Sequence, residues 1–420
     1  MTGKPEPPRR RRSLTHVGGE VAIAGDTTLA QMLARALAVE PAPEPRAEAA
    51  QDDDPDRQHV HGFHTYPARM HPATAAGLVR AVSAEGGVVL DPFCGSGTVL
   101  VEAMLASRQA VGTDLNPIAV RLARLKTTPA NPAAREAIRA GAATVAELAA
   151  DRRARRAGAT RRYPPEDVAA FDPHVLLELD SLRAGIAEQA SSAPVRSALE
   201  LVLSAILVKV SRRRSDTSSG GAARRIAAGF PTRLFRRKAD ELARRLGDLA
   251  DRLPPGARAA RVELDDAVRL RSVGASTVDA VVTSPPYVAT YDYLAHHALR
   301  LRWLGLDASA LASGELGARR RYARKDARSA GDAWAGELSR ALRALARVCR
   351  RNARVALLMA DSAVGTSALR ADAIVAAIAP SEGFAVLARA SQIRPHFHEP
   401  TADAFRRTPR AEHAIVIEKR

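Results

Sequence analysis

The chain has 420 residues, of which 46% are hydrophobic and two are cysteine, and its formal net charge at pH 7 is +17. The apolar content is sufficient for a buried core, which excludes a disordered protein, and two cysteines can form neither a disulfide framework nor a tetrahedral thiolate zinc site. Because no apolar run approaches the roughly 18 residues of a membrane span and no apolar stretch follows the basic N-terminus, the sequence predicts a cytoplasmic protein without membrane contact.

The N-terminal region, residues 1–57, is rich in proline, alanine and acidic residues and predicts a mobile tail, although residues 29–39 could dock as a helix. From His59 onward, short β-branched runs alternate with amphipathic stretches, a pattern typical of a parallel sheet with crossover helices. Seven runs are expected to form strands: 88–90, 110–112, 261–264, 278–282, 355–359, 385–390 and 414–417. The first five are short and apolar, as in strands that are buried on both faces.

The alternation stops between residues 127 and 260, where helical patterns are separated by Pro-Pro and Gly-Gly breaks. The chain is therefore expected to divide into four parts. These are the tail (1–57), a first α/β part (58–126), a helical, basic insertion (127–260) and a second α/β part (261–420).

The loop after the first expected strand is the first candidate site. It reads Asp-Pro-Phe-Cys-Gly-Ser-Gly-Thr from Asp91 to Thr98, and a helical pattern follows. Gly95 and Gly97 allow a tight turn and a close approach to a ligand, and Asp114, after the second strand, stands where an acidic side chain takes ribose hydroxyls. An acid at the strand end and the lack of a Gly-Lys-Ser/Thr sequence disfavour a pyrophosphate. The loop therefore favours a nucleoside-like cofactor without phosphates, although an ordinary strand-to-helix turn has the same pattern.

This octapeptide resembles the first motif of the S-adenosylmethionine-dependent methyltransferases that act on exocyclic amino groups of nucleic-acid bases. The resemblance implies a class I, Rossmann-like α/β fold with a seven-stranded, mostly parallel sheet and one antiparallel strand, to which the helical insertion is added. It also implies S-adenosyl-L-methionine as the cofactor. The residues that it assigns to the cofactor are Tyr66, Pro67, Asp91, Phe93, Gly95, Ser96, Gly97, Thr98, Asp114, Asn116, Asp265 and Asp266. Asp265 and Asp266 match an acidic position near the adenine, although a solvated strand end would carry the same pair.

The fourth expected strand is followed by Ser284, Pro285, Pro286 and Tyr287. Two prolines at the carboxyl end of a buried strand remove donors and fix φ, which gives a rigid rim at the ligand-binding edge of the sheet. The Ser284 hydroxyl and the Pro285 carbonyl are acceptors that can hold an aromatic amine, and Tyr287 offers a face on which an extruded base can stack. A Pro-Pro turn with a packing tyrosine is the alternative, which the order of the two motifs disfavours.

The tetrapeptide resembles the same family's (Asp/Asn/Ser)-Pro-Pro-(Tyr/Phe) motif, in which serine leans towards cytosine N4 and Asp or Asn towards adenine N6. The resemblance implies a catalytic role for all four residues. Methylation at cytosine C5 is disfavoured because it needs a nucleophilic cysteine next to a proline, whereas Cys94 belongs to the cofactor loop and Cys349 to an expected helix. Downstream, Tyr291 and Tyr293 either contact the base or pack in an amphipathic helix.

Four histidines precede the first expected strand, at positions 59, 61, 64 and 71. None of them has an acidic or thiol companion at ligand spacing in the sequence. The sequence therefore predicts polar packing for these side chains and no metal site.

Positive charge is concentrated in the expected insertion, where twelve basic residues against three acidic ones lie between Lys209 and Arg245. Short polar residues among arginines suit phosphate contacts, which favours DNA binding and target recognition over a solvated face or a codon bias toward arginine. The expected contacts are Arg212, Arg213, Arg214, Arg236, Arg237 and Lys238. Binding through them should be sensitive to salt.

The sequence thus predicts a site-specific DNA methyltransferase that transfers a methyl group to the exocyclic amine of a flipped base, with cytosine N4 preferred over adenine N6. Its partners would be DNA and a cognate restriction endonuclease. Two alternatives stay open. One is an RNA base N-methyltransferase acting on guanine N2 of tRNA or rRNA, and the other is a catalytically silent DNA-binding regulator.

Overall fold

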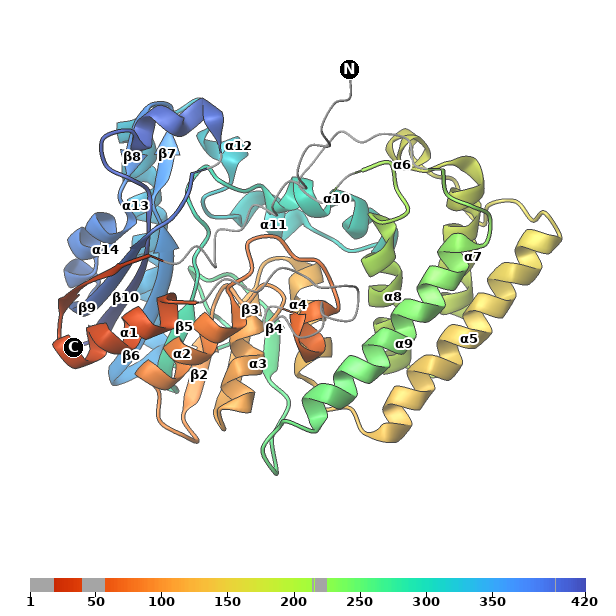
Figure 1. Cartoon of the computed structure of the whole chain (residues 1–420), viewed down its shortest axis with the longest axis horizontal. Helices are drawn as coiled ribbons and strands as arrows, with labels where there is room; N and C mark the ends of the chain where they lie inside the picture. Colours follow the sequence, from red (N-terminus) through yellow and green to blue (C-terminus); the bar gives the residue numbers. More distant parts are fainter. Residues whose placement is uncertain (1–18, 40–56, 214, 216–224, 397) are drawn as a thin grey trace, which may run out of the picture.

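The computed structural model describes residues 19–39, 57–213, 215, 225–396 and 398–420 (Figure 1). In this part of the chain one large sheet has helices on both faces, and a group of further helices stands beside it (Figure 1). The apolar runs that the sequence places in strands form this sheet, because strands covered on both faces need apolar side chains on both sides.

Eight strands form the sheet: β1 (Val21–Gly25), β2 (Val88–Asp91), β3 (Gln109–Asp114), β4 (Arg261–Leu264), β5 (Val278–Thr283), β6 (Cys349–Ala360), β9 (Phe384–Ile393) and β10 (Ala411–Lys419). They lie in the order β1-β9-β10-β6-β5-β2-β3-β4. The five strands from β4 to β6 pair in parallel, and β10 runs antiparallel between β6 and β9. The last strand thus lies antiparallel between two strands that run in the opposite direction, which is the class I methyltransferase arrangement. The expected fold class is therefore confirmed.

The strand count differs from the expected seven because of β1 and the helix after it, α1 (Thr27–Leu37). β1 pairs antiparallel with β9, which adds an eighth strand and a second reversed strand. Asp26 caps α1 by accepting a 2.8 Å hydrogen bond from the Leu29 amide, and the apolar face of α1 is buried. The prediction of a mobile tail is therefore wrong for residues 19–39, where the docked helix considered as the alternative is present. The rest of that tail lies outside the described residues.

Helices cover the two faces of the sheet. The first layer consists of α1, α2 (Pro72–Val82) and α3 (Thr98–Leu105), and the second of α13 (Ala327–Val348) and α14 (Ala371–Ile378). Successive side chains of β5 point to opposite faces of the sheet. Ala280 and Val282 pack in the core under the first helix layer, and Val281 packs in the core under the second. The carboxyl ends of the strands thereby stand at one edge of a rigid scaffold.

Between β3 and β4 the chain leaves the α/β alternation and forms a series of helices. These are α4 (Pro117–Thr127), α5 (Pro132–Ala154), α6 (Pro165–Ala170), α7 (Pro173–Gln189), α8 (Ala193–Leu207) and α9 (Phe230–Ala250). Helices α5 to α9 stand beyond the β4 edge of the sheet (Figure 1). Their apolar core extends onto α4 and onto α10 (Tyr293–Leu304), so the insertion is joined to the cofactor side of the fold.

The remaining elements are short: η3 (His59–Gly62), α11 (Ser309–Gly314), α12 (Arg319–Tyr322), β7 (Ser362–Val364), β8 (Ser367–Leu369), η4 (Pro380–Glu382) and η5 (Glu399–Phe405). β7 and β8 pair with each other in a separate two-stranded sheet. Cys349, which the sequence places in a helix, is the first residue of β6. Among the described residues, no helix has the length and apolar character that a membrane crossing requires.

Candidate active site

The cofactor loop runs from Asp91, at the end of β2, to Gly97, the N-cap of α3. Gly95 and Gly97 have φ values of 48° and 85°, a region that side-chain-bearing residues rarely adopt. A Cβ on Gly97 would lie 3.0 Å from the Cα of Ala123 in α4, so the glycine also permits the close approach of loop and helix. The loop therefore makes the tight turn that the sequence predicts.

The loop forms one wall of a cavity at the carboxyl ends of β2, β3 and β5, which we call the cofactor cavity. It contains about 820 Å³ of space between atoms, part of it open to solvent. Of the residues that the sequence assigns to the site, those that line it are Tyr66, Asp91, Phe93, Gly95, Ser96, Thr98, Asp114, Asn116, Ser284 and Pro286. Those outside its lining are Pro67, Gly97, Asp265, Asp266, Pro285 and Tyr287. Two motifs that are almost 200 residues apart in sequence thus meet in one cavity.

Asp91 is a buried acid at the centre of this cavity wall. Its Oδ1 accepts hydrogen bonds from Thr283 Oγ1 at 2.6 Å and from the Phe93 amide at 3.1 Å. Burial raises the pKa of Asp91 to about 7, against the lowering effect of these two hydrogen bonds, and the charge of Asp114 adds to the rise. A cationic ligand beside Asp91 would lower this pKa, so the carboxyl group would be ionised near neutral pH when such a ligand is bound.

Asp114 connects the loops that follow β2 and β3. Its Oδ2 accepts a hydrogen bond from the Gly95 amide at 2.9 Å, and its Oδ1 accepts one from the Asn116 amide at 2.8 Å. Burial raises the pKa of Asp114 to about 6. The carboxylate is held firmly in the cavity wall, where its remaining lone pairs are acceptors for hydroxyl groups.

Glu315 is a third carboxyl group of the cavity, and no sequence motif pointed to it. It follows α11, is 4% exposed and accepts a 2.6 Å hydrogen bond from the Tyr293 amide. Arg320 forms an ion pair with it, and burial nevertheless raises its pKa. No local motif marks Glu315, because its place in the cavity depends on how α10 and α11 fold back over the sheet.

Aromatic side chains form another wall. The rings of Tyr66 and Tyr293 stack with centroids 6.1 Å apart, and the ring of His297 lies 4.9 Å from that of Tyr66. Asn116 donates a 2.7 Å hydrogen bond from Nδ2 to Nδ1 of His297. Tyr291 lies 5.7 Å from Tyr293 at the same end of α10. The segment before β2 is thereby fixed over the loop that follows β3.

Asp265 and Asp266 do not reach the cavity. The Oδ2 of Asp265 accepts hydrogen bonds from the amide and the hydroxyl of Ser272, both at 2.7 Å, and Asp266 Oδ1 accepts one from the Val268 amide at 3.0 Å. These carboxylates stabilise the turn after β4, and Ala267 is the residue of this turn that lines the cavity. The geometry therefore favours the strand-end alternative over an adenine contact.

Tyr287 also lies elsewhere than expected. Its ring packs against the core between the sheet and α13, and its hydroxyl donates a 3.3 Å hydrogen bond to Oε1 of Glu412. Burial raises the pKa of this phenol well above its ordinary value. The structural alternative of a packing tyrosine thus describes Tyr287, and Tyr293 is the aromatic residue of this region that faces the cavity.

Residues 44–125, which include the cofactor loop, match the family model described as DNA methylase. This segment is therefore similar to the DNA methylases. It is 41% identical over 76 residues to the Type II methyltransferase M.MvaI of Kocuria varians, which is 17% of this chain and 17% of that protein. It is 33% identical over 69 residues to the Type II methyltransferase M.MjaII of Methanocaldococcus jannaschii, 16% of this chain and 13% of that protein. The chain therefore matches less than about a fifth of the length of either relative.

Solved structures of similar fold include TrmN from Thermus thermophilus, with 15% identity and a TM-score of 0.32, covering 84% of this chain and 49% of that one. They also include the rRNA methyltransferase AviRa from Streptomyces viridochromogenes, with 14% identity and a TM-score of 0.33, covering 89% of this chain and 94% of that one. At these TM-scores the likeness carries no information on the substrate. The strand order of the sheet establishes the fold of this chain.

The family and the cavity agree on the cofactor, which is S-adenosyl-L-methionine. The buried carboxyl groups of Asp91, Asp114 and Glu315 suit a sulfonium cation and ribose hydroxyls, and they would repel a pyrophosphate. Cys94 also lines the cavity, but burial raises the pKa of its thiol well above its ordinary value. A neutral thiol is a poor nucleophile, so the burial of Cys94 disfavours the covalent chemistry that methylation at cytosine C5 requires.

The residues that the sequence predicts as DNA contacts fall into three groups. Lys238 is 5% exposed, and its ammonium group is paired with Glu241 at 2.8 Å, so its assignment as a phosphate contact is wrong. Arg212 is exposed and paired with Asp172 at 2.8 Å. Arg236 and Arg237 are exposed on α9, and Arg213 is partly exposed, whereas Arg214 lies outside the described residues.

Proposed function

We propose that this protein is a DNA methylase that transfers the methyl group of S-adenosylmethionine to the exocyclic amine of a base flipped out of DNA. The observation that carries the proposal is that Ser284 and Pro286 line the same cavity as Asp91 and Asp114. An amine held at the rim formed by Ser284 is therefore next to the carboxyl groups that suit the cofactor. Extrusion of the base is required because its amine cannot enter such a cavity from within a duplex.

The proposed catalytic residues are those of the tetrapeptide at the end of β5. The Ser284 hydroxyl and the Pro285 carbonyl would accept hydrogen bonds from the amine and stabilise the charge that develops on its nitrogen. Pro285 and Pro286 would keep this rim rigid. S-adenosylmethionine, when bound, supplies an electrophilic methyl group. The stacking face proposed for the base belongs to Tyr293 and Tyr66, since Tyr287 packs in the core.

We propose cytosine N4 as the preferred target over adenine N6. The support is the serine at position 284, since serine in this place of the motif leans towards cytosine. The neutral state of the buried Cys94 thiol further supports an amine over the cytosine C5 atom. We place the reaction in the cytoplasm, with a restriction endonuclease of the same recognition site as the proposed partner.

The proposed DNA surface is the exposed basic side of α9. Arg233, Arg236 and Arg237 lie within two turns of this helix and are exposed, and Lys238 behind them is buried. Phosphate contacts from such arginines fix register and orientation, and they do not read sequence. Target selection would then depend on other parts of the insertion.

The deciding experiment is incubation of the protein with labelled cofactor and, separately, duplex DNA, single-stranded DNA or total RNA, followed by mass spectrometry of the nucleosides. We expect N4-methylcytosine in duplex DNA. N6-methyladenine would change the proposed target base and leave the proposed reaction on DNA intact. Label in RNA alone would instead identify the protein as an RNA base N-methyltransferase. No label in any nucleic acid, with cofactor bound, would favour the silent DNA-binding regulator.

A further inference from the structure

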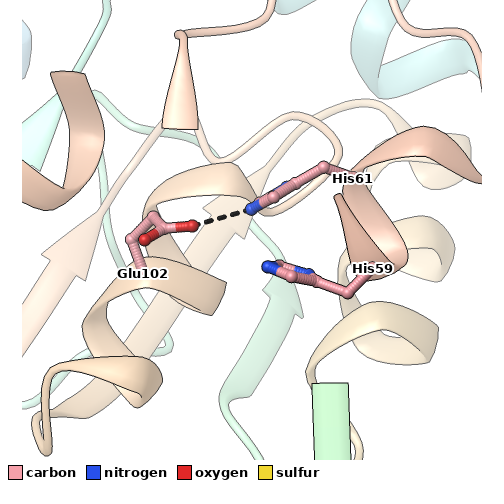
Figure 2. A group of neighbouring side chains, drawn as sticks. All are labelled: His59, His61 and Glu102. Carbon is pink, nitrogen blue, oxygen red and sulfur yellow. Dashed lines mark hydrogen bonds and ion pairs between the residues drawn. The ribbon is translucent and has the colours of Figure 1, made fainter. Parts of the chain in front are cut away.

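Two histidines and one glutamate form a buried cluster outside the cofactor cavity. His59 and His61 lie in η3, and Glu102 lies on α3 (Figure 2). Nε2 of His61 is 2.8 Å from Oε1 of Glu102, and the ring of His59 lies beside that of His61 with centroids 4.6 Å apart. Figure 2 shows His59 directed toward the pair, and one possible ligand atom from each residue lies within 4.8 Å of the others.

Each histidine of the cluster buries one ring nitrogen that has no hydrogen-bond partner among the described residues. The exposed fraction is 6% for His59 and 1% for His61, and Nδ1 of each ring has no hydrogen-bond partner among the described residues. Buried polar atoms are normally paired, so two orphaned ring nitrogens in one cluster need an explanation. His59 also has a φ of 34°, a costly conformation for a residue other than glycine, and the guanidinium of Arg245 stabilises it by a 2.8 Å hydrogen bond to the His59 carbonyl.

We propose that His59, His61 and Glu102 bind a divalent metal ion of the zinc type, with water as a further ligand. Two imidazoles and one carboxylate are a ligand set that zinc uses in proteins. The sequence predicts no metal site because no acid stands near these histidines in the chain. Glu102 enters the cluster only when α3 packs against η3.

The charges around the cluster oppose the binding of a cation. They belong to Lys126, Arg69, Arg245 and Arg252, which lie close enough to act on the two histidines. Glu102 is the acidic member of the three proposed ligands, and its Oε1 already lies 2.8 Å from Nε2 of His61. A bound ion would depend on the charge of this carboxylate, so Glu102 is the decisive ligand.

A second cluster, of two carboxylates and one histidine, differs from this one because its carboxylates already have partners. Asp361, Asp372 and His413 also lie close together, but Asp361 is paired with Arg370 at 2.7 Å and accepts hydrogen bonds from the amides of Ala371 and Ala411. Asp372 is paired with Arg389. Arginine and backbone donors already satisfy these carboxylates, so this cluster is an ion-pair network.

The proposed ion would have a structural role. None of its three ligands lines the cofactor cavity, but η3 leads directly to Tyr66, which does, and α3 begins at the cofactor loop. An ion between η3 and α3 would fix these two walls of the cavity relative to each other. This inference is independent of the proposed target base and of turnover.

The test measures bound metal in the untagged full-length protein by mass spectrometry after incubation with zinc and gel filtration. We expect about one zinc per chain and a fall of a few degrees in Tm when EDTA removes it. Glu102→Gln, which keeps an oxygen acceptor for His61, and His59→Asn, which tolerates the positive φ, should lose both the zinc and the response to EDTA. His174→Asn, which alters an exposed histidine, is the matched control and should keep them.

Two outcomes would overturn the proposal. One is wild-type protein that retains less than about a tenth of an equivalent of zinc, and the other is stoichiometric zinc in folded Glu102→Gln. If the variants do not fold, X-ray absorption spectroscopy of the zinc-loaded wild-type protein identifies the ligand atoms instead. Nitrogen and oxygen ligands at about 2.0–2.2 Å support the site, and a sulfur shell near 2.3 Å contradicts it.

Discussion

The hydroxyl of Thr283 donates a 2.6 Å hydrogen bond to Oδ1 of Asp91. Thr283 is the last residue of β5 and Asp91 the last of β2, and these strands are parallel neighbours in the sheet. The bond therefore joins the strand that ends in the proposed catalytic tetrapeptide to the strand that ends in the cofactor loop. Both groups are buried, so the two motifs are held in a fixed relation before any ligand enters.

Asp91 should make the stability of the unliganded protein depend on pH. Its folded-state pKa of about 7 is above the ordinary carboxyl value, so its contribution to stability is greatest below pH 4 and is lost as the pH rises through 7. A cationic cofactor prefers the ionised form, so its affinity should rise over the same range. Scanning calorimetry between pH 5 and 8.5, with and without S-adenosylmethionine, measures both effects.

Asp91→Asn should reduce the slope of both pH profiles, and the slope that remains in the stability profile should come from the other buried carboxyl groups, Asp114 with a pKa of about 6 and Glu102 with a pKa of about 7. Thr283→Val is the companion change. Loss of its hydrogen bond should lower the free energy of unfolding by about 1 kcal/mol and raise the pKa of Asp91 further. Profiles of Asp91→Asn that match those of the wild type would show that another group titrates.

Ser284→Ala should abolish most turnover while leaving cofactor affinity unchanged. The serine hydroxyl is the proposed acceptor for the amine, and its loss removes an interaction that is strongest in the transition state, at a cost of roughly 10²-fold in kcat. Single-turnover kinetics and calorimetric titration with S-adenosylmethionine separate the two properties. A parallel loss of cofactor binding would place Ser284 against the cofactor rather than the base.

Arg236 and Arg237 should govern the salt dependence of DNA binding. Replacing both with alanine should weaken binding to all sequences alike and reduce the slope of log K against log salt by roughly 2, because each phosphate contact releases counterions. Arg244→Ala is the control on the same helix, since Arg244 is exposed but paired with Asp248 at 3.0 Å. An unchanged slope in the double variant would move the DNA interface away from α9.

Lys238→Met should instead affect folding. The ammonium group is buried between Glu241 and the ring of Phe63, 5.2 Å from the ring centroid, so the variant loses an ion pair without losing a surface charge. We expect a decrease of about 1–3 kcal/mol in the free energy of unfolding, measured by denaturant titration. The slope of log K against log salt for DNA binding should equal that of the wild type. A reduced slope would show that Lys238 does contact DNA.

Arg300 should connect the insertion to the cofactor segment. This 1% exposed arginine on α10 donates hydrogen bonds to the Ser204 carbonyl on α8 and to Thr65 Oγ1, the latter at 3.0 Å. Arg300→Met should therefore lower Tm and weaken cofactor binding, because Thr65 precedes the cavity residue Tyr66. Arg302→Met is the control, since Arg302 on the same helix pairs with Asp167 of the insertion. Arg302→Met should lower Tm and leave cofactor affinity unchanged. If both variants lost cofactor affinity equally, Arg300 would not connect the insertion to the cofactor segment.

The sequence by itself determined the α/β class, the seven central and C-terminal strands and the two motifs at strand ends. These features are local, because a strand buried on both faces needs a continuous apolar run and a tight strand-to-helix turn needs glycine. Ser284 and Asp91 could be placed near each other for the same reason, since parallel strands present their carboxyl ends at one edge.

Only the tertiary structure decided which side chains reach the cavity. Strand β1 escaped prediction because its partner β9 lies more than 350 residues away along the chain. Glu315 and Glu102 carry no local signal, and they become part of a cavity and a cluster through packing of distant helices. Lys238 and Tyr287 resemble surface and stacking residues in sequence, yet long-range packing buries Lys238 and places Tyr287 against the core. Burial depends on the summed contacts of the whole chain, which no short pattern contains.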